Sequence, residues 1–277
     1  IVADTAVLAA APRELAGSGY ADLLAKPCSV ADWILARDVA GEEFDPEPLE
    51  IMNGVVEPVI EAGHGVAVGD PAATETLMAG LLLSGLSMAA AGTSQPASGA
   101  EHLVSHFWDM IGHRDGWELD LHGRQVGIGC ILMSALWERL LKLEADDLVP
   151  AEGCDAGSLE ADMRAVYGPL SEPCLREIRG KSPAPDAVGA RLRRARELWP
   201  ELKRLLADTV VPAGQMRADL AAGGAPLRLE QIGRGPDDAR LALRWARTLR
   251  NRYTCLDLAA ETGRLEGWID ELVAEVS

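Results

Sequence analysis

The sequence is poor in the residues that build β-sheets. Aromatic residues make up only 4% of its 277 residues, although 48% are hydrophobic. Alanine, leucine and glycine fill most apolar positions, which favours close-packed helices over sheet. Alternation of apolar and polar residues never persists beyond a few positions. We therefore expect an all-α protein, with at most a short edge strand at residues 1–4.

Positive charge is also scarce. The chain has 26 Lys and Arg against 43 Asp and Glu, a net charge of -17. Nucleic acids and anionic membranes both require clustered basic residues, so the composition excludes both as partners. An anionic small molecule would need its own local basic groups.

Cysteine usage gives no disulfide framework. Five cysteines form an odd set without Cys-x-x-Cys spacing, which indicates reduced thiols and a cytoplasmic location. The N-terminus lacks the basic lead of a signal peptide. The most apolar stretch, Leu77 to Ala91, is too short and too mixed to span a membrane, so it predicts a buried central helix.

Glycine and proline divide the rest into helical segments. We expect helices near residues 7–15, 17–26, 29–40, 49–61, 120–143, 158–168, 172–180, 186–207, 212–222, 236–250, 254–263 and 266–276. A loop is expected at Gly63–Gly69, with His64 exposed in it. No linker divides the chain convincingly, so we expect one helical domain over residues 1–277.

Four of the five histidines lie between Ser98 and Gly129, and three of them, His102, His106 and His122, have an informative spacing. His102 and His106 are four residues apart and would share a helix face. A polar break then allows a returning helix to bring His122 beside either of them. Such a pair forms a metal half-site that a carboxylate and a water would complete. Histidines that cap helices or satisfy core polar groups are the alternative, and the spacing alone leaves both open.

Three glycines interrupt the helix expected after this break. Gly123, Gly127 and Gly129 each cost about 1 kcal/mol of helix stability relative to alanine. We expect them where another backbone or a ligand approaches the helix closely.

Three motifs resemble those of a known superfamily. G-Y-A-D-L-L-A-K, S-G-A-E-H-L-V-S-H and H-G-R-Q-V-G-I-G look like the metal-site motifs of the iron-containing alcohol dehydrogenases and dehydroquinate synthases. Within it, the sn-glycerol-1-phosphate dehydrogenases are the most similar family. Leu23–Trp33 and Arg252–Ala259 also resemble that family, and the likeness covers nearly the whole chain.

The resemblance implies roles for five residues. Asp22, His102 and His122 match the family's metal ligands. His106 matches a histidine that relays a proton or contacts the substrate. Lys26 sits where phosphate-handling relatives place a lysine, which favours a phosphorylated small-molecule substrate.

The implied chemistry is a metal-assisted hydride transfer. One carboxylate and two imidazoles leave an open position on Zn²⁺; the same set suits Fe²⁺, and Ni²⁺ stays open. The resemblance implies reduction of dihydroxyacetone phosphate to sn-glycerol 1-phosphate. The metal would act as Lewis acid, NAD(H) or NADP(H) would supply the hydride, and His106 would deliver the proton.

One expected feature of the family is missing from the sequence. No G-x-G-x-x-G motif follows a strand, so we expect the dinucleotide-binding domain to be absent from this chain. A separate nucleotide-binding chain or a second copy of this chain would then be the partner. A cyclase or lyase resembling dehydroquinate synthase and a non-catalytic partner subunit are the alternatives. The retained site residues count against the subunit, since a scaffold does not need them.

Overall fold

The computed structural model describes residues 2–153, 156–182 and 186–277. Every regular element in these ranges is a helix, which confirms the all-α prediction. Residues 2–4 form no strand, so the predicted edge strand is wrong for these residues, and Ile1 lies outside the described part of the chain. The side chain of Asp4 accepts hydrogen bonds from the backbone N–H groups of Ala6 and Val7, at 2.9 and 3.2 Å, and so caps α1 (Thr5–Ala9). A helix cap thus replaces the strand.

The helices follow one another with short connections. After α1 they are α2 (Arg13–Leu23), α3 (Lys26–Leu35), α4 (Glu47–Glu50), α5 (Val56–Glu61), α6 (Gly63–Val68), α7 (Pro71–Ala91), α8 (Ala100–Asp115), α9 (His122–Leu140), α10 (Ala156–Tyr167), α11 (Ser171–Lys181), α12 (Ala187–Thr209), α13 (Ala213–Ala222), α14 (Pro236–Trp245), α15 (Cys255–Glu261) and α16 (Leu265–Ala274). One turn of π-helix, Ala36–Ala40, extends α3.

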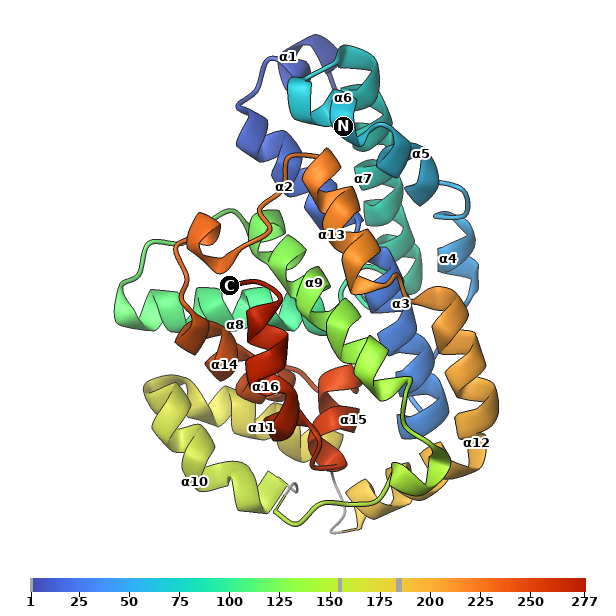
Figure 1. The fold of residues 1–277 in the computed structure, drawn as a ribbon, viewed down its shortest axis with the longest axis vertical. Helices are drawn as coiled ribbons and strands as arrows, with labels where there is room; N and C mark the ends of the chain where they lie inside the picture. Colours follow the sequence, from blue (N-terminus) through green and yellow to red (C-terminus); the bar gives the residue numbers. More distant parts are fainter. Residues whose placement is uncertain (1, 154–155, 183–185) are drawn as a thin grey trace.

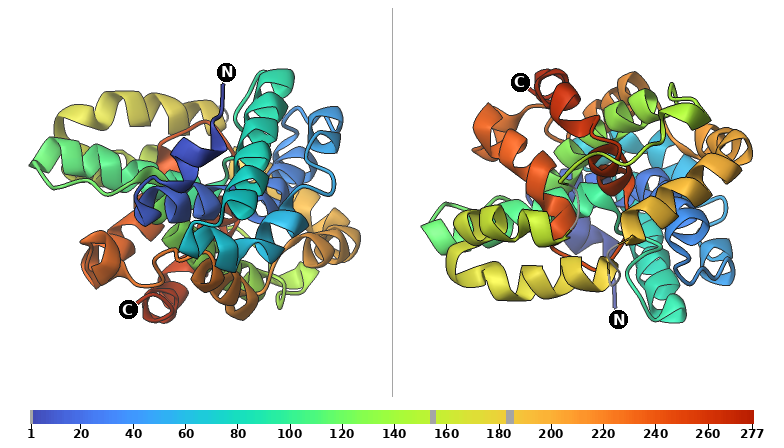
Figure 2. Two further views of the ribbon diagram at one scale, coloured as in Figure 1. Left: turned by 90° about the horizontal axis from the view of Figure 1, so that it is seen from above. Right: turned by 90° about the horizontal axis from the view of Figure 1, so that it is seen from below.

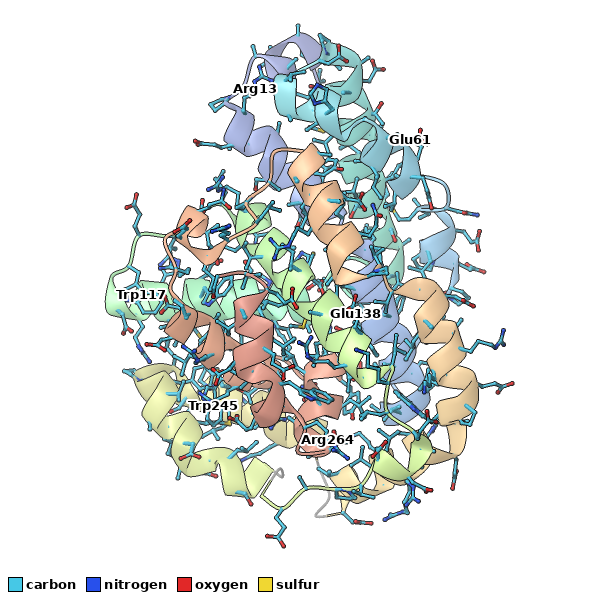
Figure 3. The ribbon with its side chains drawn as sticks, in the orientation of Figure 1. Arg13, Glu61, Trp117, Glu138, Trp245 and Arg264 are labelled. Atoms are coloured by element: carbon cyan, nitrogen blue, oxygen red, sulfur yellow. The ribbon has the colours of Figure 1, made fainter. Side chains whose placement is uncertain are left out.

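Helix α9 is the centre of the molecule. Almost all of its residues from Gly123 to Trp137 are buried, and it packs against α2, α8, α13, α15 and α16. Figure 1 shows it in green, crossing the middle of the ribbon. Glu138 near its C-terminal end accepts a hydrogen bond from the backbone N–H of Ala213 at 2.9 Å, which joins α9 to α13 (Figure 3).

The apolar stretch Leu77–Ala91 is therefore not the buried central helix that we predicted. It belongs to α7, which lies at the outside of the helical array (Figure 2), and Leu86 is 58% exposed. By length and composition alone α7 could cross a membrane, and only 33% of its most apolar window is buried. One such helix is weak evidence of a membrane span. The composition correctly predicted an apolar helix here. It could not show whether that helix lies at the centre of the core or at its edge.

Close approach of neighbouring backbones explains two of the three glycines of α9, as we expected, whereas a Cβ atom at the third, Gly127, would lie 3.1 Å from the side chain of Ala21. A Cβ atom at Gly123 would lie 2.0 Å from the carbonyl oxygen of Ser18 in α2. One at Gly129 would lie 2.5 Å from the carbonyl oxygen of Glu101 in α8. Neither position has room for a side chain, so α9 packs directly on the backbones of α2 and α8.

The remaining predictions differ in detail. Residues 63–68 form α6 rather than a loop, although His64 is exposed as predicted. Pro12 separates α1 from α2 instead of lying within one helix. The described cysteines are free and buried, as a reduced protein requires, and Cys154 lies outside the described residues.

Candidate metal centre

Three helix ends bring Asp22, His102 and His122 together. Asp22 is the penultimate residue of α2, His102 the third of α8 and His122 the first of α9. The Oδ1 atom of Asp22 lies 3.1 Å from Nε2 of His102 and 3.7 Å from Nε2 of His122. One ligand atom of each residue lies within 4.8 Å of the others. The predicted assembly of these three side chains therefore forms.

The sequence left open which histidine His122 would meet, and the structure gives both. The centroid of the His122 ring lies 5.1 Å from that of His102 and 5.2 Å from that of His106. His106, Asp109 and His122 form a second group whose ligand atoms also lie within 4.8 Å of one another. His122 belongs to both groups.

The geometry of the first group suits a transition metal. Nitrogen and oxygen ligands about 2.0–2.1 Å from a tetrahedral zinc ion lie roughly 3.3 Å apart, close to the separations around Asp22. The His102 side chain is 8% exposed, whereas those of Asp22 and His122 are 35% and 41% exposed. One side of the group thus faces the protein and the other faces solvent, where a further ligand can enter.

The electrostatics of the group favour a cation. Burial opposes ionisation of Asp22, but the hydrogen bond and positive charge of His102 outweigh it and lower the pKa of this carboxyl. Burial lowers the pKa of His102, yet hydrogen bonds to Asp22 and Glu101 overcome it and raise that pKa to about 9. Burial and the neighbouring His102 lower the pKa of His122. Two carboxylates around one buried imidazole attract positive charge, whether a proton or a metal ion supplies it.

His106 lies one helical turn beyond His102, and their ring centroids are 6.3 Å apart. Burial, followed by the nearby His122 and His102, lowers the pKa of His106 to about 4. Its imidazole is therefore neutral near pH 7 and can accept a proton beside the group.

Lys26 lies at the start of α3 and is 4% exposed. Its ammonium donates a hydrogen bond to the carbonyl oxygen of Pro96 at 3.1 Å. Burial lowers the pKa of Lys26 to about 8, against the charges of Asp22 and Glu101, which raise it. The charge of Lys26, which the motif predicted, thus interacts with the carboxylates of the metal group, but most of the Lys26 side chain is buried.

The small polar loop at residues 92–99 supports this arrangement. Ser29 and Lys26 both donate to the Pro96 carbonyl, and Arg252 donates to the backbone and side-chain oxygens of Ser98. Gln95 donates to Glu42 at 2.8 Å. These bonds fix the loop that leads into α8 and so fix where His102 stands.

Sequence reasoning missed two side chains that orient the histidines. Glu101 Oε1 lies 2.8 Å from Nδ1 of His102, and Ser105 Oγ lies 3.1 Å from Nδ1 of His122. Neighbouring residues on a helix project in different directions, so spacing gave no reason to pair Glu101 with His102. Ser105 meets His122 only through the packing of α8 on α9.

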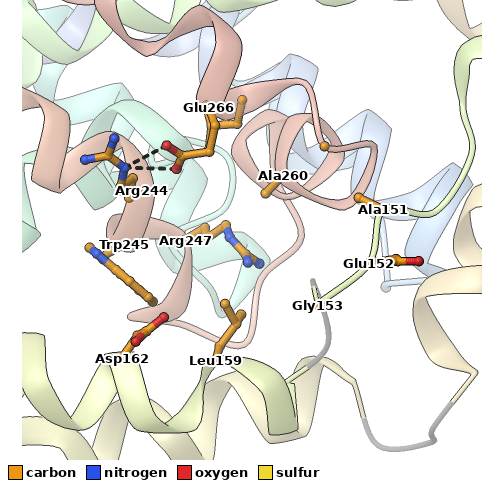
Figure 4. Close-up of a pocket in the computed structure, with 12 residues that line it drawn as sticks. Ala151, Glu152, Gly153, Leu159, Asp162, Arg244, Trp245, Arg247, Ala260 and Glu266 are labelled. Atoms are coloured by element: carbon orange, nitrogen blue, oxygen red, sulfur yellow. Dashed lines mark hydrogen bonds and ion pairs between the residues drawn. The ribbon is translucent and has the colours of Figure 1, made fainter.

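The cavity drawn in Figure 4, with a volume of about 400 Å³, lies away from this group. It is lined by α10, α14, α15 and α16, and Arg244 on its wall is paired with Glu266 at 2.9 Å. Arg247 on the same wall lies 3.4 Å from Asp257. Because these two cations already have acidic partners, neither is left unpaired to bind an anionic ligand.

Comparison with known proteins gives consistent relatives, although no family model matches the chain. A glycerol-1-phosphate dehydrogenase (NAD(P)+) of Bacillus subtilis is 29% identical over 266 residues. The protein of the same name from Bacillus velezensis is 30% identical over 267 residues. Another, from Archaeoglobus fulgidus, is 36% identical over 139 residues, which are 50% of this chain and 38% of the relative.

The two Bacillus matches take in 96% of this chain but only 56% of each relative. The chain therefore spans about half the length of the curated relatives it matches. The similarity extends over nearly the whole chain and agrees with the three motifs. The chain is similar to glycerol-1-phosphate dehydrogenases over this length.

Proposed function

We propose that this chain is the metal- and substrate-binding part of an NAD(P)-dependent oxidoreductase that reduces dihydroxyacetone phosphate to sn-glycerol 1-phosphate. The observation that carries the proposal is the convergence of Asp22, His102 and His122 on one partly open point. The names of the relatives support the reaction class and the nicotinamide cofactor.

A divalent cation held by these three residues would supply Lewis-acid chemistry at the substrate carbonyl. Zn²⁺ is our first choice because its preferred ligands are imidazole and carboxylate, and Fe²⁺ and Ni²⁺ accept the same set. The chain's own contribution is to hold the ligands in place through Glu101 and Ser105.

Proton delivery is assigned to His106. Its ring lies 5.2 Å from that of His122, on the same face of α8 as His102, and it is neutral near pH 7. A neutral imidazole carries one N–H, so it can donate that proton to a developing alkoxide while its other ring nitrogen takes up a proton from solvent, and such catalysis typically contributes a factor of about 10²–10⁴ in rate.

Lys26 is assigned to the substrate phosphate. The chain carries a net charge of -17, so a phosphate needs a local cation, and Lys26 is one turn from Asp22. Its hydrogen bond to the Pro96 carbonyl would have to be shared with the incoming phosphate. We expect the loop at residues 92–99 to shift when a phosphorylated ligand binds.

The nicotinamide is assigned to a region outside this chain. The described residues contain no strand, and the relatives are nearly twice as long as the part matched here. Positioning of two reactants can account for roughly 7–11 kcal/mol of barrier reduction, and a freely diffusing cofactor does not obtain it.

The test is an assay of dihydroxyacetone phosphate reduction with NADH and with NADPH. The chain is assayed alone and then together with the part of the Bacillus subtilis relative that it does not match. We expect metal binding by the chain alone and substrate-dependent NAD(P)H oxidation only in the mixture. Robust NAD(P)H oxidation by the chain alone would contradict the proposal that the nicotinamide binds to a region outside this chain. Conversion of a phosphorylated substrate without net NAD(P)H oxidation would favour the cyclase or lyase instead.

A further inference from the structure

The carboxylate of Glu101 is wholly buried beside the candidate metal centre. Its Oε1 atom accepts a hydrogen bond from the backbone N–H of Gly99 at 2.6 Å and lies 2.8 Å from Nδ1 of His102. Its Oε2 atom is buried and has no hydrogen-bond partner among the described residues. A buried carboxylate with one oxygen unsatisfied is costly, so it needs compensation from nearby positive charge.

His102 lies between two carboxylates. Nδ1 faces Glu101, and Nε2 lies 3.1 Å from Oδ1 of Asp22. A carboxylate oxygen accepts hydrogen bonds, so both ring nitrogens can carry protons while no metal ion is bound. When Nε2, which points toward Asp22, binds a cation, the remaining ring proton is on Nδ1 and is donated to Glu101. Glu101 thus fixes the orientation of the ring in which Nε2 faces the centre.

Asp32 accepts hydrogen bonds that fix the backbone next to Glu101. One of its oxygens accepts from the backbone N–H of Ala100 at 2.7 Å, and the other accepts from that of Cys255 at 2.8 Å. These two residues begin α8 and α15, so a single buried carboxylate ties both helix starts to α3. A Cβ atom at Gly99 would lie 2.7 Å from Asp32 and 2.8 Å from Glu101, so any side chain at this position would collide with both carboxylates.

We infer that Glu101 is a positioning residue for the metal centre, which accepts the proton of His102 Nδ1 and so orients the ring with Nε2 toward the bound ion. This inference rests on the proposed metal site. In metalloproteins, outer carboxylates that orient a ligating histidine typically change metal affinity by about 10- to 100-fold when they are removed.

The test compares Zn²⁺ affinity by isothermal titration calorimetry in the wild type and in Glu101→Leu, Glu101→Gln and a control, Glu75→Gln. Glu75 is exposed on α7, so its substitution removes one negative charge away from the site. We expect the Leu variant to lose about 10- to 100-fold in affinity. The Gln variant should lose less, because its amide oxygen still accepts from Nδ1, and the control should match the wild type.

A second readout separates positioning from general stability. The visible spectrum of bound Co²⁺ reports ligand geometry, so it should change in Glu101→Leu and largely return in Glu101→Gln. Where the Leu variant does not fold, the Gln variant must still bind Zn²⁺ more weakly than the wild type. A folded Leu variant with wild-type Zn²⁺ affinity and Co²⁺ spectrum would overturn the role of Glu101, as would a Gln variant with wild-type Zn²⁺ affinity where the Leu variant does not fold. A wild type that binds no Zn²⁺ would instead overturn the metal centre itself.

Discussion

Replacement of Gly123 by alanine tests how the packing of α9 on α2 supports the metal centre. The added Cβ atom would lie 2.0 Å from the carbonyl oxygen of Ser18, about 1.4 Å inside the ordinary contact limit of 3.4 Å. A backbone carbonyl cannot rotate away as a flexible side chain can, so the two helices must separate. Overpacking of this kind typically costs about 1–3 kcal/mol, which exceeds the roughly 1 kcal/mol that alanine adds in helix propensity.

The same displacement acts on the metal ligands. His122 precedes Gly123 on α9, and Asp22 follows Ser18 by one turn of α2. Metal–ligand distances tolerate deviations of only about 0.2 Å, so separation of these helices should weaken metal binding more than it weakens the fold. At about 2–4 °C per kcal/mol for a chain of this size, the melting temperature should fall by several degrees.

The assay is thermal unfolding without metal, followed by Zn²⁺ titration. Gly267→Ala in α16 is the matched control, because a Cβ atom there would meet nothing within 4 Å. The control should gain up to about 1 kcal/mol in the free energy of unfolding and keep its metal affinity. A Gly123→Ala protein as stable as that control, with unchanged Zn²⁺ affinity, would refute the packing argument.

Three further predictions concern individual side chains. His106→Ala should keep the metal and lower turnover about 10²–10⁴-fold, and loss of metal as complete as in His102→Ala would contradict its assigned role. Lys26→Ala should weaken binding of dihydroxyacetone phosphate far more than that of dihydroxyacetone, measured by ligand titration, and equal losses would remove the phosphate argument. Burial and the charge of Glu101 raise the pKa of Asp32 to about 7 from 3.8. Folding therefore favours the protonated form of Asp32. As the pH rises from 4 to 7, the unfolding free energy of the wild type should fall by a few kcal/mol relative to that of Asp32→Asn, because each unit of pKa difference is worth about 1.4 kcal/mol. Denaturant unfolding of both proteins across that range measures the difference, and parallel pH profiles would contradict it.

Local pattern predicted most of the helices and the assembly of the candidate centre. Caps, glycines and prolines mark helix ends over a few residues. Spacing related the histidines to one another, and only the resemblance of the motifs to a known family related Asp22 to them. The position of α7 was not predictable, because an apolar helix has the same composition at the centre of a core and at its edge. The close packing of α9 on the backbones of α2 and α8 depends on Gly123 and Gly129, where no side chain fits.

The support around the centre depends on contacts between distant parts of the chain. Asp32 meets Ala100 across 68 residues and Cys255 across 223 residues. Glu101 meets His102 only because the ring of His102 turns back over the first turn of α8. No periodicity or spacing encodes such contacts, so they emerge only from the tertiary packing.

Metal content is the most direct test of the central claim. The wild type and the alanine variants of Asp22, His102 and His122 would be loaded with Zn²⁺, desalted and measured by atomic emission against protein concentration. We predict one ion per wild-type chain and well below one in each variant, with helical circular dichroism retained. A wild type without metal, or variants that each keep a full equivalent, would contradict the assignment of these three residues as the metal ligands.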